Sequence, residues 1–70
     1  MHRTPVTSSN ILSIGYDPHS AVLEVEFTSG DVYQYLNVPE FLFQQFLHAG
    51  SHGHFLNEHI RYNYRYQKIN

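Results

Sequence analysis

The stretch VYQYLNVPEFLF, Val32 to Phe43, decides the fold, because an alternating strand pattern changes here into a helical one. Tyr33 and Tyr35 lie one residue apart, as in a strand with one buried face. Pro39 cannot donate a hydrogen bond to a sheet but suits the first turn of a helix, where Glu40 complements the helix dipole. The apolar residues that follow recur at helical spacing: Leu42, Phe43, Phe46 and Leu47.

Two strands joined by a turn are predicted before this stretch. The first, Asn10 to Tyr16, has Leu12, Ile14 and Tyr16 on one face by alternation. Asp17-Pro18 then favours a type I turn. In the second strand apolar and polar residues alternate, so that the acids face water: Leu23, Val25 and Phe27 against Glu24, Glu26 and Thr28.

The register of the third strand, Val32 to Asn37, depends on the loop Ser29-Gly30-Asp31. A three-residue loop pairs Val25 with Tyr35 and places both tyrosines of the strand on the core face. A two-residue loop pairs Val25 with Leu36 and turns both tyrosines away, because a one-residue slip changes the face of every side chain. We favour the three-residue loop, with Gly30 or Asp31 in the left-handed conformation.

A second helix and a closing strand are predicted after Gly50, which supplies a left-handed cap for the first helix. Ser51 is suited to N-cap the second helix. The apolar stripe of that helix comprises Phe55, Leu56, His59 and Ile60. The last segment, Tyr62 to Ile69, alternates as a strand, with Tyr62, Tyr64 and Tyr66 on one face and Arg61, Asn63, Arg65 and Gln67 on the other.

The element order β-β-β-α-α-β predicts a single α+β domain over residues 1–70, with a small antiparallel sheet. We expect residues 6–69 to be ordered and residues 1–5 to be frayed. The helices are expected to cover one face of the sheet, because large apolar side chains such as Phe43 and Phe46 need burial. The other face is then exposed, and the functional surface is expected there.

Composition limits how this chain is stabilised and where it resides. It has no cysteine, which excludes disulfides and thiolate metal sites, so its five Phe and six Tyr must supply much of the core. The amino-terminal MHRTPVTSSN has no apolar run after its arginine, so no signal peptide is expected. The longest apolar cluster, Phe41 to Phe43, is far too short to span a membrane. We therefore expect a cytoplasmic protein.

Positive charge is concentrated at the carboxyl end. The chain as a whole has a net charge of −2, which opposes binding to nucleic acid. Residues 1–60 hold all six acids and a single arginine, Arg3, whereas residues 61–70 hold Arg61, Arg65 and Lys68 and no acid. Such an asymmetry indicates interaction with an anionic partner.

Many spaced residues of the chain resemble the KTSC domain family, and the resemblance covers about Val6 to Ile69. They are Ser8-Ser9, Ile14 to Asp17, Leu23 to Phe27, Gly30, Tyr33, Tyr35, Val38-Pro39, Ala49, Ser51, Gly53, Asn57, Ile60-Arg61 and Tyr64. The family comprises short domains at the carboxyl end of some lysyl-tRNA synthetases and small free-standing bacterial proteins. The resemblance implies RNA binding only as a suggestion, and it implies no aminoacylation because no synthetase domain is present. The histidine-rich Ser51 to His54 segment departs from the family pattern.

Tyrosines close to arginines form the base-stacking surfaces of several small RNA-binding domains. We expect a site for RNA or another single strand on the tyrosine-rich sheet face and the basic last strand: Tyr33, Tyr35, Arg61, Tyr64, Arg65, Tyr66 and Lys68. The competing interpretation is cross-strand packing of the tyrosines beside solvated cations. The alternative function is a protein-interaction or self-association module, with a homodimer or a protein partner, because sheet edges and exposed aromatic faces pair with other chains.

Metal binding and catalysis find little support in the sequence. His48, His52, His54 and His59 lie close together in the chain, but zinc needs three or four converging ligands, and Gly50 interrupts the helix between the first two. The serines lack a nucleophile motif, and the glycines lie at turns and helix ends. We expect no metal, no cofactor and no enzymatic activity.

Overall fold

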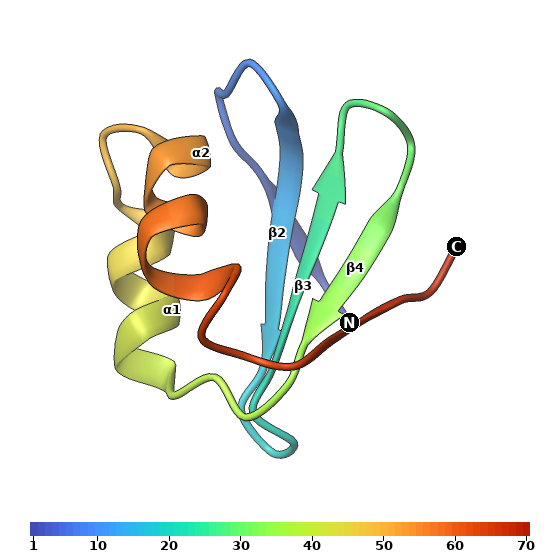
Figure 1. Cartoon of the computed structure of the whole chain (residues 1–70), viewed down its shortest axis with the longest axis vertical. Helices are drawn as coiled ribbons and strands as arrows, with labels where there is room; N and C mark the ends of the chain where they lie inside the picture. Colours follow the sequence, from blue (N-terminus) through green and yellow to red (C-terminus); the bar gives the residue numbers. More distant parts are fainter.

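The computed structural model describes residues 1–70 as an antiparallel sheet with helices on one of its faces (Figure 1). The strands follow the order β1-β2-β3-β4-β5 across the sheet. The predicted α+β class is therefore confirmed, with one strand added at the amino end. The elements are β1 (Arg3–Pro5), β2 (Ile11–Asp17), β3 (Val22–Phe27), β4 (Val32–Tyr35), α1 (Glu40–Leu47), α2 (His52–Phe55), the π-helical segment η1 (Leu56–Ile60) and β5 (Tyr66–Lys68).

The additional strand, β1, is formed by residues for which the sequence predicted no regular structure. Arg3 pairs with Gly15 of β2. A Cβ atom at Gly15 would lie 2.6 Å from the carbonyl oxygen of His2, so only glycine lets the two strands approach this closely. The Arg3 guanidinium also lies 3.2 Å from Glu24 on β3. These long-range contacts leave no periodic signal in the sequence of residues 1–5.

In β2 the prediction of a buried Leu12 is wrong. The register against β3 shifts between Ile11 and Ser13, which marks a β-bulge. Leu12 is consequently 46% exposed, whereas Ile11 and Ile14 are completely buried. Ser13 lies on the opposite face, where its hydroxyl donates to Glu26 over 2.9 Å. The bulge inserts one residue, and simple alternation cannot anticipate it.

The hairpin between β3 and β4 has the predicted three-residue loop, but the loop is Thr28-Ser29-Gly30. The Gly30 amide donates to the Phe27 carbonyl, and the Phe27 amide donates to the Asp31 carbonyl, each over 2.9 Å. Gly30 has a φ of +96°, so this is a type I turn followed by a left-handed glycine. Because the loop begins one residue earlier than predicted, Tyr35 pairs with Leu23 and not with Val25. The register moves by two residues, so the tyrosines stay on the core face as predicted.

The switch from β4 to α1 is fixed by backbone hydrogen bonds around Val38. Asn37 takes a left-handed φ of +59°, and the Val38 amide donates to the Ala21 carbonyl over 2.9 Å. The Tyr16 hydroxyl donates to the Val38 carbonyl over 2.6 Å. Pro39 is the extended N-cap of α1 and not part of its first turn as predicted, so the helix begins at Glu40.

The second helix begins at its predicted cap and runs through its predicted apolar stripe to Ile60. The Ser51 hydroxyl accepts a hydrogen bond from the His54 amide, which confirms the cap. α2 continues directly into η1, whose widened turn is closed by a 2.8 Å bond from the Arg61 amide to the Leu56 carbonyl. Of the predicted stripe, Leu56 and Ile60 are buried, Phe55 is half-buried and His59 is exposed.

The core lies between the sheet and these helices. Its completely buried side chains come from β2, β3, the switch, α1 and η1: Ile11, Ile14, Leu23, Val25, Val38, Phe46 and Ile60. α1 has eight residues, whereas about 20 apolar residues are needed to cross a bilayer, and no helix of the chain meets that requirement.

The closing strand is shorter than predicted. β5 comprises Tyr66–Lys68 and pairs with β4, whereas residues 61–65 form a turn. The Asn63 amide donates to the Ile60 carbonyl over 3.1 Å, and the Leu36 amide reaches the Arg65 carbonyl over 2.8 Å. Tyr62 and Tyr64 therefore lie outside the strand, because the helix persists to Ile60 and the chain must then reverse.

Candidate functional site

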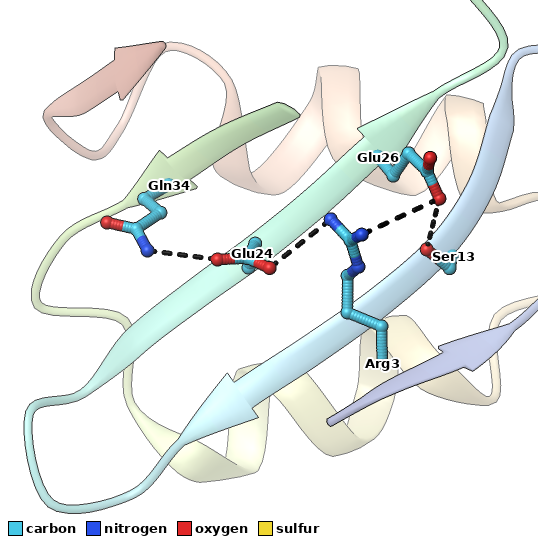
Figure 2. A network of polar contacts seen from close by, with 5 residues as sticks. All are labelled: Arg3, Ser13, Glu24, Glu26 and Gln34. Carbon is cyan, nitrogen blue, oxygen red and sulfur yellow. Dashed lines mark hydrogen bonds and ion pairs between the residues drawn. The ribbon is translucent and has the colours of Figure 1, made fainter. Parts of the chain in front are cut away.

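The face of the sheet that the helices leave open carries a polar network and none of the strand tyrosines. Figure 2 shows Arg3 between Glu24 and Glu26, with Gln34 donating to Glu24 over 2.9 Å. Gln67 of β5 donates to Gln34 over 3.0 Å and extends the network. Two carboxylates and one guanidinium leave this face with a net negative charge, which opposes phosphate binding. The expectation of an exposed tyrosine surface on the open face is therefore wrong.

The tyrosines gather on the helix side of the sheet instead. Tyr33, Tyr35 and Tyr66, which we call the tyrosine cluster, have ring centroids 5.5 to 6.5 Å apart in each pair. Phe27 meets Tyr33 edge-to-face at 5.7 Å. Apart from the contact between Tyr33 and Tyr35 within β4, these contacts are typical cross-strand packing. The cluster extends from the core to the surface, because Tyr35 is 3% exposed and Tyr66 is 58% exposed.

A groove of about 480 Å³ lies where this cluster meets the β3–β4 loop and η1. One side comes from the loop and includes Asp31. The other side comes from η1 and the following turn and includes Asn57, Arg61 and Tyr62. All three members of the tyrosine cluster also line the groove. Of the predicted site residues, Tyr33, Tyr35, Arg61 and Tyr66 are brought together here.

A second, more open hollow adjoins the groove and is formed by residues 61–66. It contains Arg61 and Arg65 with Tyr62 and Tyr66. Tyr62 is 80% exposed, whereas Tyr64 is half-buried against the core. Arg61, Tyr62 and Tyr66 line both the hollow and the groove, so the two surfaces are continuous.

The four cations of the chain differ in their partners. Arg3 pairs with Glu24 and Glu26 on the open face, and Lys68 lies 3.3 Å from Asp31. Arg61 and Arg65 pair with no carboxylate, although Arg61 donates to the Asn57 amide oxygen over 3.3 Å. The Arg61 guanidinium also lies 5.5 Å from the centre of the Tyr62 ring. Both unpaired guanidinium groups therefore belong to the hollow.

Asp31, Asn57 and Tyr62 belong to this surface but were not predicted as site residues. Asn57 and Arg61 are four residues apart in a helical turn, so their contact follows once the helix is known to continue to Ile60. The predicted stripe of this helix already reached Ile60, but the following residues were predicted as part of the closing strand, which hid the contact. The position of Asp31 depends on the hairpin loop, whose start was predicted one residue too late.

Burial raises the pKa of the Tyr35 hydroxyl above its usual range, and the nearby charge of Arg61 partly opposes this effect. The hydroxyl is therefore neutral at physiological pH and can donate a hydrogen bond. None of the side-chain hydrogen bonds of the protein uses it. The groove thus contains a polar group without a partner in the protein.

The histidines do not gather into a ligand set. His52 contacts the Leu47 carbonyl oxygen over 3.1 Å, and His54 lies 3.5 Å from Glu58. No three His, Asp or Glu side chains are close enough to hold a metal ion together.

Comparisons with known proteins agree with the architecture. The KTSC domain model matches residues 7–64. A crystal structure of a KTSC domain protein from Yersinia pestis has a TM-score of 0.96 and 46% identity, covering 99% of this chain and 97% of that one. An uncharacterised protein from Stutzerimonas stutzeri is 43% identical over 70 residues, 99% of each chain. A lysine–tRNA ligase from Nostoc is 30% identical over 61 residues, which are 87% of this chain but 11% of the ligase.

Proposed function

The chain belongs to the KTSC domain family, and from this premise we propose that it is a non-enzymatic module that binds single-stranded RNA. The binding surface is the hollow at residues 61–66 together with the adjoining groove. The similar segment of a lysine–tRNA ligase, a protein that by its name acts on an RNA, supports this choice of partner. The cytoplasm is the compartment that we propose for this activity.

One observation carries the proposal: both guanidinium groups that lack a carboxylate partner lie beside the exposed tyrosines Tyr62 and Tyr66. An unpaired guanidinium can neutralise a phosphate without first breaking an ion pair. An exposed tyrosine ring can stack on an unpaired base, and each such contact is worth about 1–3 kcal/mol. The combination fits a strand whose bases are not paired.

The charge distribution leaves a small surface for binding phosphates on this side of the molecule. The acids Glu24 and Glu26 lie on the opposite face, and Asp31 is compensated by Lys68. Two phosphate contacts on a single strand correspond to a slope of about −1.4 in log K against log salt. Binding is therefore expected to be weak and moderately sensitive to salt.

Titration of the labelled protein with a short single-stranded RNA, followed by two-dimensional NMR at two salt concentrations, tests the proposal. Shifts are expected at residues 61–66 and at the tyrosine cluster. Arg61→Ala combined with Arg65→Ala is expected to weaken binding and to reduce the salt slope by about 1.4. Arg3→Ala, which removes a charge from the open face, is the control and is expected to leave the shifts at residues 61–66 unchanged.

A matched pair of aromatic variants separates stacking from charge. Tyr62→Ala is expected to weaken binding by about five-fold or more. Phe41→Ala removes an aromatic ring that is 66% exposed on α1, away from the hollow, and is expected to have no effect. Equal losses in both variants, or no shifts with millimolar RNA at low salt, would contradict the proposal. A concentration-dependent dimer without RNA binding would instead favour self-association.

A further inference from the structure

The groove beside the hollow has polar groups at defined places around an aromatic surface. Its volume of about 480 Å³ is within the range of about 300–1,000 Å³ that is usual for small-molecule sites. The tyrosine cluster supplies the apolar surface, and Tyr66 is its most exposed ring. A flat ring system is the shape that such a surface accepts best.

Two acceptor or donor groups in the groove are free to bind a ligand. One carboxylate oxygen of Asp31 lies 3.3 Å from Lys68, and the other has no partner in the protein. The Tyr35 hydroxyl lies on a side chain that is 97% buried and makes no hydrogen bond within the protein, although its ring lines the groove. A hydroxyl that has no partner in the protein and belongs to a residue lining the groove can form a hydrogen bond with a ligand there.

The charges around the groove select the kind of ligand. Aromatic rings with a carboxylate can hold a methylated ammonium group. Here, however, Arg61 lines the same groove and Lys68 already neutralises Asp31, so a ligand with only positive charge would be repelled. A ligand with a flat ring, hydrogen-bond donors at one edge and a negative charge elsewhere satisfies Tyr66, Asp31 and Arg61 together. A nucleotide has these features.

We infer that the groove accepts one unpaired guanine nucleotide, with its base on the tyrosine cluster, its Watson–Crick edge on Asp31 and its phosphate toward Arg61. A carboxylate accepts hydrogen bonds only, and guanine presents two adjacent donors, N1–H and N2–H₂. Adenine, cytosine and uracil each present a single donor at this edge next to an acceptor that the carboxylate repels. This inference rests on the proposed function and names the base that the surface prefers.

The test is an NMR titration of the protein with GMP, AMP, CMP and UMP, each up to millimolar concentration, beside the RNA titration. GMP is expected to shift the tyrosine cluster and Asn57 at concentrations about ten-fold lower than the others. Asp31→Asn is expected to weaken GMP binding about ten-fold and to strengthen AMP binding, because the asparagine amide offers one acceptor and one donor, which match the donor and acceptor at the adenine edge. If Asp31 had only a structural role, the substitution would change the affinities for GMP and AMP in the same direction.

Two further variants keep the inference testable if Asp31→Asn folds poorly. Tyr35→Phe removes only the hydroxyl and is expected to weaken GMP about three-fold or more. Glu58→Gln removes the same charge as Asp31→Asn from an exposed position on η1 outside the groove, and it is expected to leave GMP binding unchanged.

The outcomes separate the two proposals. RNA binding at residues 61–66 with equal affinity for all four nucleotides would overturn the guanine assignment and leave the proposed function intact. Absence of both RNA and nucleotide binding would overturn both. Binding of a trimethyl-lysine peptide in place of GMP would also overturn the assignment, because it would show that the carboxylate dominates the groove.

Discussion

Replacing Tyr16 by phenylalanine removes the hydrogen bond that joins β2 to the strand-to-helix switch. The Tyr16 hydroxyl lies 2.6 Å from the Val38 carbonyl oxygen, and Val38 is completely buried. The ring of residue 16 would still stack on Phe43, whose centroid is 4.9 Å away, so the variant isolates the hydrogen bond from the packing.

The expected loss in the free energy of unfolding is about 1–2 kcal/mol, because the Val38 carbonyl would remain buried without this partner. In a domain of this size, each 1 kcal/mol lowers the melting temperature by about 4–8 °C. Tyr62→Phe is the control, since the Tyr62 ring is 80% exposed and its hydroxyl takes part in no hydrogen bond within the protein. Urea denaturation of the three proteins at pH 7 gives the comparison.

The pH dependence provides an independent check of the same bond. Burial, followed by the charges of Glu40 and Asp17, raises the pKa of Tyr16 in the folded state. The unfolded chain therefore loses this proton first, and the stabilisation present below about pH 10 is lost as the pH rises through the folded pKa. The difference between wild type and Tyr16→Phe should shrink above pH 10. A loss below about 0.3 kcal/mol at pH 7, or a difference that stays constant to pH 11, would refute the reasoning.

Three further substitutions test the fold. Gly15→Ala places a Cβ 2.6 Å from the His2 carbonyl, so amide hydrogen exchange in β1 should accelerate while the core stays protected; unchanged exchange would contradict the close approach. The new methyl group in Gly30→Ala would meet no neighbouring atom, so any loss of stability must come from backbone strain at φ +96°. The expected loss in the free energy of unfolding, measured by thermal unfolding, is about 1–2 kcal/mol, and Gly30→Asn should lose less. Hydrogen bonds from Ser20 and the His19 amide lower the pKa of Asp17. Asp17→Asn should therefore destabilise the protein at pH 7, and the difference should shrink as the pH falls through the lowered folded-state pKa of Asp17; a difference that stays constant in acid would exclude this explanation.

Local patterns were sufficient for most of the architecture. Alternation in Leu23, Val25 and Phe27 predicted β3, and the sequence around Pro39 predicted the start of α1. Ser51 was correctly predicted as a helix cap. These signals lie within a few residues of the feature that they specify, so they can be recognised without knowledge of the rest of the chain.

The candidate site was predicted only in part, because its geometry depends on contacts between distant segments. The tyrosines of β4 were correctly placed on the core face, but the hollow was not anticipated. It exists because residues 61–65 form a turn after η1, where the sequence predicted the start of the closing strand, and this turn brings Arg61 and Tyr62 beside Tyr66. Asp31 joined the groove because the hairpin loop begins at Thr28.

The sequence by itself therefore determined the strands of the β3–β4 hairpin, the switch at Val38-Pro39, the α+β class and the concentration of positive charge after Ile60. Only the tertiary structure decided that β1 joins the sheet, that Leu12 bulges outward and that the tyrosines meet the arginines on the helix side. The physical reason is that periodicity and capping depend on residues that are close together in the sequence. Strand edges, bulges and grooves are instead selected by the packing of residues far apart in the sequence.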